Sequence, residues 1–509
     1  MDRRTFLKLL AATPLLAACG GAAPAPASGS AAAKSTGGTL TVAQTGDPGF
    51  TAINSVGIDT YNVSQHIFDS LFRFDANAQP APGLAESWST SADGLTWTFK
   101  LRKGVKFHNG EDFTSEAIKY SIAKLQDDKS TRRVYLTAIK EVRTPDDLTA
   151  EIVTARPAPS LPIYIAQIID IYPPKYMAQV GDEEFNKKPI GTGLYKFVDW
   201  QRDQQIALEA NKSYFGGPPA YDKLVFRFIP EPSTRVAELL AGNVQVINFP
   251  PIQQLDQIAS SGQATAPNSK GTQIYHVILR TDRKPFDDKR VRQALNYAVD
   301  VDAIVKQLYA GRATRLAGPI PPHAVGYDPD LKPYTFDIAK AKQLLADAGY
   351  ANGLSFKLDI GVPSQAEGKQ LADALGGFWK QAGINADLTA MDYATFVTNQ
   401  NAKKMNDAGL TVWSGPTFDA DVILGPRIFS KAPASYYNNP QMDQLINDGG
   451  GTLDKAKRLD AYKKAGQLFQ DDAGWVFLFV PFYNFGVSNK VSWPPRADGN
   501  LYMNDARPK

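Results

Sequence analysis

The stretch LAESWSTSADGLTWTFKLRKGVKFHNGEDFTSEAIKYS, residues 84–121, contains the most specific order of strand, turn and helix signals in the chain. Trp97, Phe99 and Leu101 alternate with polar residues, which is the period of a strand with one buried face. The dipeptide Asp93-Gly94 precedes them and is typical of a tight turn. We therefore expect a strand centred on Phe99 that the chain enters from a turn.

The second half of this stretch predicts a shorter strand and then a helix. Val105 and Phe107 alternate with polar neighbours, and Asn109-Gly110 after them is a second turn signal. Thr114 or Ser115 can cap the following helix, because a hydroxyl accepts a hydrogen bond from the free backbone N–H groups of a first turn. The residues at helical spacing that should face the core are Ala117, Ile118, Ser121, Ile122 and Leu125.

Residues 85–114 closely resemble the signature segment of the bacterial extracytoplasmic solute-binding proteins of the peptide/nickel class, family 5. These proteins are the ligand-capturing subunits of ATP-driven (ABC) importers. The resemblance implies an α/β fold of the periplasmic-binding-protein type (type II, large cluster C form), with two main lobes, a hinge and a smaller inserted third lobe. It recurs in the same order along nearly the whole chain, in GTGLYKF (191–197), NKSYFGGP (211–218), KLVFRFIP (223–230), LLAGNVQV (239–246), PFDDKRVRQALNYAVD (285–300) and AKQLLADAGY (341–350).

The expected elements divide the chain into three lobes, and a length of 509 residues is too great for one ordinary core. Strand signals dominate up to about residue 280, and helices then alternate with strands, which is typical of an α/β lobe around a central sheet. We expect a discontinuous lobe I (residues 39–83, 190–283 and 481–509), a smaller lobe II (residues 84–189) and a lobe III (residues 284–480).

Capping residues predict where several helices begin. Asp337 should cap one helix, and Ser364 with Glu367 forms a capping box at the start of another. Further expected elements are a strand over 39–42, a helix over 64–72, a strand over 384–390, a helix over 454–472 with Leu459 facing inward, and a strand over 475–485 interrupted at Pro481.

Residues 1–19 indicate an export signal, with Arg3 and Arg4 ahead of an apolar run too short to span a bilayer permanently. The order DRRTFLK resembles a twin-arginine signal. Residues 16–19, LAAC, resemble a lipoprotein cleavage box, in which Cys19 would become the lipid-modified N-terminus. The alternative for a lone cysteine is a small buried hydrophobic residue, but its place after an apolar run favours the anchor. Residues 20–38, rich in Ala, Gly, Ser and Pro, would then be a flexible tether.

Composition and motifs favour a soluble binding protein over an enzyme or a nucleic-acid binder. The formal net charge is +3, and removal of the signal leaves 52 basic and 51 acidic residues, which does not indicate nucleic-acid binding. The four histidines have no metal-ligand spacing, and neither a Walker loop nor a G-x-S-x-G motif is present. We therefore expect no catalysis, no metal and no cofactor.

The best candidate for a ligand wall is the segment from Val412 to Asp421. In peptide binders that this chain resembles, a Trp and, a few residues later, an Asp lie here, and the Asp pairs with the amine of the ligand. This chain has Trp413, but a Gly-Pro follows, and the acidic residues come later as Asp419 and Asp421. That departure disfavours a ligand held through a free amine. The alternative for Trp413 is a lid over core, and further candidates are Tyr437 on a loop and, by family position alone, Tyr61 and Tyr483.

The function that this sequence predicts is solute capture for an ABC importer, in a cleft that closes between lobes. The favoured cargo is a short peptide, and an oligosaccharide stacked on aromatic walls is the alternative within the class. A surface chaperone or sensor with the same fold is the alternative from another class. The expected partners are two membrane subunits and a cytoplasmic ATPase. We expect an extracytoplasmic, lipid-anchored monomer.

Overall fold

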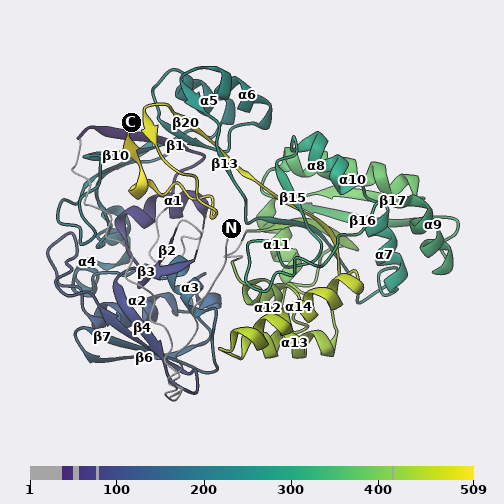
Figure 1. Cartoon of the computed structure of the whole chain (residues 1–509), viewed down its shortest axis with the longest axis horizontal. Helices are drawn as coiled ribbons and strands as arrows, with labels where there is room; N and C mark the ends of the chain where they lie inside the picture. Colours follow the sequence, from purple (N-terminus) through teal and green to yellow (C-terminus); the bar gives the residue numbers. More distant parts are fainter. Residues whose placement is uncertain (1–36, 50–56, 76–78, 415–417) are drawn as a thin grey trace, which may run out of the picture.

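The computed structural model describes residues 37–49, 57–75, 79–414 and 418–509, which form two bodies lying side by side (Figure 1). Lobes I and II make up one body, because one continuous core of buried side chains runs through both. Lobe III is the other body and has cores of its own. The chain crosses between the bodies at residues 270–273 and again at Phe482. The predicted export signal, Cys19 and nearly all of the predicted tether lie outside the described residues.

Lobe I is built on an eight-stranded sheet whose central strand is β1. Leu40 and Val42 of β1 are fully buried, as the alternation of apolar residues there predicts. The strand order is β12-β20-β11-β1-β10-β9-β8, with β13 paired to β20, so the last long strand of the chain returns to the sheet of the first. The strands are β1 (Thr39–Gln44), β8 (Tyr195–Gln201), β9 (Gln205–Ala210), β10 (Lys223–Phe228), β11 (Val246–Asn248), β12 (Ala264–Thr265), β13 (Asn268–Ser269) and β20 (Tyr483–Ser488), and the helices are α1 (Ile58–Ile67), α5 (Pro232–Leu240) and α6 (Leu255–Ser260).

Lobe II contains residues 84–121, the stretch with the most specific order of strand, turn and helix signals. Its predicted strand is β5, with Trp97, Phe99 and Leu101 buried, and its predicted helix begins at Ser115. The short strand expected over 105–107 is wrong: only an isolated bridge between Lys106 and Asp112 forms there. The strand order is β4-β5-β7-β6, from β4 (Ala85–Thr90), β5 (Thr96–Leu101), β6 (Ile139–Asp146) and β7 (Thr149–Thr154), with the helices α2 (Ser115–Leu125), α3 (Leu161–Ile168) and α4 (Pro174–Lys187) and the short helix η1 (Arg133–Tyr135). The strand pair β2 (Phe72–Phe74) and β3 (Pro80–Pro82) comes from the lobe I part of the sequence and packs against α3.

Lobe III is an α/β layer around a six-stranded sheet of order β15-β19-β14-β18-β16-β17. The Asp337 carboxylate accepts a hydrogen bond from Lys340 N at 2.8 Å and caps α9, as predicted. The elements are β14 (Ile274–Leu279), β15 (Ala313–Arg315), β16 (Leu354–Gly361), β17 (Ile384–Ala390), β18 (Ala408–Trp413) and β19 (Trp475–Pro481), with α7 (Lys289–Tyr297), α8 (Val301–Leu308), α9 (Ile338–Asp347), α10 (Gln365–Gln381), α11 (Tyr393–Asn401), α12 (Asp421–Arg427), α13 (Pro440–Gly450) and α14 (Lys455–Asp471).

Three further expectations differ from the structure. Strand β14 belongs to the sheet of lobe III, so this lobe begins at Ile274, ahead of the expected residue 284. The helix expected over 64–72 is α1 and ends at Ile67, because Phe68 adopts an extended backbone. Leu459 of α14 is 40% exposed rather than inward, whereas Tyr462 and Phe469, which were expected on the same inward face, are fully buried.

The carboxylate of Asp69, just beyond α1, joins two of the family-like segments. It accepts hydrogen bonds from Thr192 Oγ1 and from the Tyr214 hydroxyl, each at 2.9 Å. Burial raises the pKa of Asp69 to about 6, from an ordinary value of 3.8. The folded state therefore holds a proton on this group more tightly than the unfolded state does.

Asp69→Asn should change how stability depends on pH. In the natural protein the Asp69 contribution is fully present below pH 3.8 and is lost as pH rises to about 6, because ionising a buried carboxyl is unfavourable. The free energy of unfolding of the variant, relative to that of the natural protein, should rise by about 1–3 kcal/mol between pH 4 and pH 7. Urea unfolding at both pH values measures this difference. If the free energies of unfolding of the variant and the natural protein differ by the same amount at pH 4 and at pH 7, the burial of this carboxyl is contradicted.

Candidate functional site: the cavity between the two bodies

A cavity of about 1090 Å³ lies between the two bodies. Its walls come from both: the start of α1 and the loops after β10 and β11 on the lobe I side, and α8, the start of α10 and α11 on the lobe III side. Both crossing segments also contribute, since Thr272, Gln273, Phe482 and Tyr483 line the cavity. A change in the angle between the bodies would therefore open or close it.

Tyrosines dominate the aromatic part of the walls. Tyr309 donates a hydrogen bond of 2.6 Å to Glu367 Oε1, and the hydroxyls of Tyr483 and Thr272 lie 2.9 Å apart. Burial raises the pKa of Tyr61 and Tyr483 to about 12, so their phenols are neutral at physiological pH. They can donate or accept a hydrogen bond while their rings supply apolar surface. The tyrosines that line the cavity are Tyr61, Tyr275, Tyr309, Tyr393 and Tyr483.

Charged groups of both signs reach the cavity. Burial raises the pKa of Asp59 to about 6, and its buried Oδ1 atom has no hydrogen-bond partner in the described part of the chain. Glu367 lies across the cavity at the start of α10. Arg312 donates a 3.1 Å hydrogen bond from Nη1 to Asn484 Oδ1, which leaves other donors of its guanidinium for a ligand. The walls can therefore meet a solute that carries both an amine and a carboxylate.

Of the candidates from the sequence, Tyr61 and Tyr483 line the cavity, whereas Trp413, Asp419, Asp421 and Tyr437 do not. The ligand role of the two tyrosines stays a prediction. Asp419 is 2% exposed and forms a 2.6 Å ion pair with Arg458, so its carboxylate has no approach for a ligand amine. The Tyr437 hydroxyl donates to Asp472 at 2.5 Å within lobe III. Both side chains form bonds within lobe III and lie outside the cavity lining, which gives no support to the ligand role expected for them.

Asp421 contacts the other body instead of the cavity. Its Oδ2 atom accepts a 2.6 Å hydrogen bond from the hydroxyl of Ser160, which precedes α3 in lobe II. Near this contact the rings of Phe74 and Phe418 lie 5.1 Å apart and also join the two bodies. Ser160 and Asp421 thus form a latch between lobes II and III at the starts of α3 and α12, two helices that Figure 1 shows below the crossing segment next to β13.

Ser160→Ala should favour separation of the bodies. A buried hydrogen bond to a carboxylate contributes about 1.5 kcal/mol, so the closed arrangement should lose roughly tenfold in population relative to the open one. Small-angle X-ray scattering should show a larger radius of gyration for the variant. Thr144→Ala is the matched control, because Thr144 bonds to Glu116 within lobe II. An unchanged radius in Ser160→Ala would contradict the latch.

Comparison with known proteins identifies the family. Residues 79–434 match the profile of the bacterial extracellular solute-binding proteins, family 5. The chain belongs to this family. Heme-binding protein A of Haemophilus influenzae is 32% identical over 94% of this chain and 93% of its own length. Glutathione-binding protein GsiB of Pectobacterium atrosepticum is 31% identical over 82% of this chain and 83% of its own.

A solved structure supports the fold. The ABC transporter-associated periplasmic binding protein DppA from Helicobacter pylori, in complex with the peptide STSA, superposes with a TM-score of 0.78 at 25% identity and covers 93% of this chain and 98% of its own. The predicted type II periplasmic-binding-protein fold is thereby confirmed. This family member is an extracytoplasmic substrate-binding component of an ABC importer. Among the described residues, no helix combines the length and apolar character that crossing a bilayer requires.

Several residues of the cavity were not found from the sequence. Glu367 was predicted only as half of a capping box, and the backbone N–H of Glu367 does donate to Ser364 Oγ at 3.3 Å. Its second role, as a wall of the cavity, follows from where α10 starts relative to lobe I. Asp59, Tyr275, Tyr309 and Arg312 carry no local signal of ligand binding, since they lie in α1, in β14 and in the loop after α8, which only the tertiary fold brings together.

Proposed function

We propose that this protein captures a short peptide in the cavity between its two bodies and delivers it to the membrane subunits of the importer. The observation that carries the proposal is the combination of charges in the cavity. Asp59 and Glu367 offer carboxylates for an amine, and Arg312 offers a guanidinium for a carboxylate. A zwitterionic peptide presents both groups, whereas a neutral oligosaccharide presents neither.

The size of the cavity and the ligands of relatives support the same choice. A volume of about 1090 Å³ is near the upper end of ordinary small-molecule sites and accommodates a tripeptide. Glutathione, the ligand named for one relative, is a tripeptide, and the peptide STSA occupies the solved relative. Haem, named for another relative, is a different solute class and serves as a competitor in the test.

Calorimetric titration of the purified chain tests the proposal. The probes are reduced glutathione, a Met-Leu dipeptide, maltotriose and haemin, each added separately at neutral pH. We expect submicromolar to micromolar binding of at least one of the two peptides, and peptide recovered chemically unchanged after long incubation. Binding of maltotriose or haemin alone would overturn the peptide assignment. A hydrolysed peptide would overturn the proposal that the protein only binds.

The proposal includes export and anchoring, in which residues 1–19 direct export and Cys19 carries the lipid. Cys19→Ser should then move the protein from the membrane fraction to the soluble extracytoplasmic fraction, because a diacylglycerol chain pair holds a protein on a bilayer far more strongly than this body could alone. Cell fractionation with immunodetection measures the shift. Cys19→Ser that stays in the membrane fraction would contradict the anchor.

A further inference from the structure

Arg427, the last residue of α12, is a partly buried cation without a carboxylate partner in the part of the chain that the structure describes. Its Nη1 atom donates a long hydrogen bond of 3.4 Å to Gln400 Oε1, and its buried Nε atom bonds to none of the residues that the structure describes. Arg132 and Arg458, by contrast, pair with aspartates at 2.9 and 2.6 Å. A guanidinium left with unmade hydrogen bonds attracts an anion.

The guanidinium of Arg427 lies on the ring of Trp413. Its central carbon is 3.8 Å from the ring centroid. The indole Nε1 atom of Trp413 is also a buried donor that has no hydrogen-bond partner among the described residues. Arg427 and Trp413 therefore each have an N–H group that donates no hydrogen bond to a described residue. A group with two acceptor oxygens could accept a hydrogen bond from both.

This stack lies beside the cavity and faces lobe II. Ser414, directly after Trp413, lines the cavity, and so does Tyr393, whose hydroxyl donates to the carbonyl of Val412 at 3.3 Å. The Tyr393 phenol and that of Tyr135 in lobe II lie within electrostatic range of Arg427. Burial raises the pKa of both phenols, so neither supplies a negative charge at neutral pH.

Arg427 stays a cation under these conditions. Burial lowers the pKa of its guanidinium to about 10, which is still well above neutral pH. A desolvated charge that has no ion-pair partner among the described residues, and that lies next to the cavity-lining residue Tyr393, is more typical of a binding group than of a structural one. The carboxylates of Asp419 and Asp421 are not available to it, because they bond to Arg458 and Ser160.

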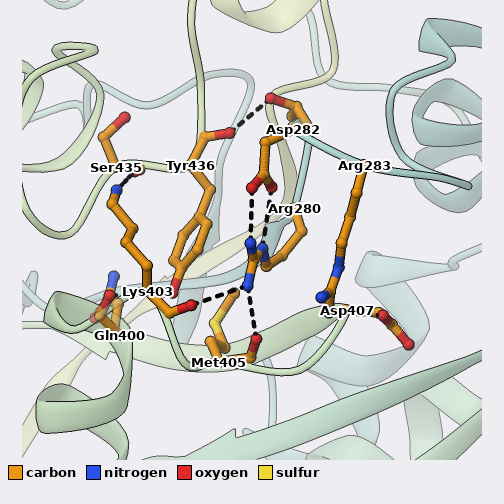
Figure 2. A network of polar contacts seen from close by, with 10 residues as sticks. Arg280, Asp282, Arg283, Gln400, Lys403, Met405, Asp407, Ser435 and Tyr436 are labelled. Carbon is orange, nitrogen blue, oxygen red and sulfur yellow. Dashed lines mark hydrogen bonds and ion pairs between the residues drawn. The ribbon is translucent and has the colours of Figure 1, made fainter.

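A polar network fixes the residue behind Arg427. Gln400 is 1% exposed, donates from Nε2 to the carbonyl of Ala434 at 3.1 Å and accepts from the Tyr436 hydroxyl through its backbone oxygen at 3.0 Å. Figure 2 shows the Tyr436 ring between Lys403 and Arg280, whose cationic groups lie 4.6 and 4.7 Å from the ring centroid. The Gln400 side chain cannot turn away, so its Oε1 atom orients the guanidinium.

We propose that Arg427 and Trp413 form an anion subsite beside the cavity that binds a carboxylate of the solute. The planar guanidinium matches the two oxygens of a carboxylate, and the indole N–H adds a third donor. The inference rests on the proposed function, in which the solute is a peptide. The carboxylate is then the C-terminus or an acidic side chain of the peptide. In this subsite Trp413 again has a ligand role. It contacts the ligand through its indole N–H and supports Arg427 by stacking, and it does not act as an aromatic wall.

Acetate tests the subsite without any peptide. In protein labelled with nitrogen-15 at tryptophan, the indole signal of Trp413, assigned with Trp413→Phe, should move downfield as acetate is added at constant ionic strength. The shift should be absent in Arg427→Gln and weakened several-fold in Arg427→Lys, which keeps the charge but loses the planar fork. The indole signals of the other tryptophans report whether each variant is folded. No acetate shift in the natural protein, or a shift with phosphate but not acetate, would overturn the proposal.

A second experiment tests whether the subsite binds the carboxylate of a peptide. The natural protein should bind the Met-Leu dipeptide about tenfold to hundredfold more tightly than its C-terminal amide, and Arg427→Gln should lower that preference about tenfold although Arg312 is intact. The same comparison with a glutathione analogue amidated at glycine covers the tripeptide. Equal binding of acid and amide to the natural protein would overturn the subsite. An acetate shift in a protein that binds neither peptide would retain the subsite and refute the peptide ligand.

Discussion

Arg458→Ala should lower the free energy of unfolding by about 3–5 kcal/mol, the largest loss that we expect from a single change of a charged residue. Arg458 and Asp419 form a 2.6 Å ion pair in which both side chains are less than a tenth exposed. Removing Arg458 leaves the Asp419 carboxylate buried without its counter-ion, and burial already raises the pKa of that carboxyl to about 6. Urea denaturation followed by circular dichroism measures the loss.

The same helix provides the control for this prediction. Lys464 and Asp460 form a 2.7 Å ion pair one helical turn apart on the surface of α14, with both side chains more than half exposed. Such pairs contribute little, so Lys464→Ala should cost no more than about 0.5 kcal/mol. Equal effects of the two alanine variants would show that Asp419 is not buried as described. They would also reopen its assignment as a ligand residue.

Gly271→Ala should destabilise the protein by about 3 kcal/mol or more, because it forces the two crossing segments apart. A Cβ atom at Gly271, between β13 and β14, would lie 2.0 Å from the carbonyl oxygen of Pro481 at the end of β19. Backbone cannot yield as a flexible side chain does, so the clash must move one crossing segment relative to the other. Differential scanning fluorimetry should show a large fall in Tm.

Gly377 supplies the matched control for Gly271. It lies exposed within α10, and a Cβ atom added there would meet nothing within 4 Å. Gly377→Ala should therefore raise stability by about 0.5–1 kcal/mol through helix propensity. If Gly271→Ala were as stable as the natural protein, the close contact between the crossing segments would be contradicted.

The sequence predicts the fold well where local signals and packing agree. The alternation of Trp97, Phe99 and Leu101 correctly predicted β5, and the cap at Asp337 correctly predicted the start of α9. The strand expected over 105–107 failed because alternation over three residues is too short to specify a ladder. The end of α1 at Ile67 was missed because apolar residues continue past it, and no glycine or proline marks the stop.

The cavity could be predicted only in part, because its walls come from segments far apart in the chain. Tyr61 and Tyr483 were proposed from family position, and both line the cavity. Asp419 was proposed because an acidic residue was expected near Trp413, but its partner Arg458 is 39 residues away and could not be inferred from local spacing. The contact between the Arg427 guanidinium and the Trp413 ring is likewise formed only in the tertiary fold.

Native mass spectrometry of the protein purified from its own host, with the bound molecule released and identified, decides whether the solute is a peptide. We expect a short peptide, or a mixture of short peptides, of a size that a cavity of about 1090 Å³ can hold. The release of a single sugar or of haem, with no peptide, would contradict the peptide claim while leaving the protein a member of the solute-binding family.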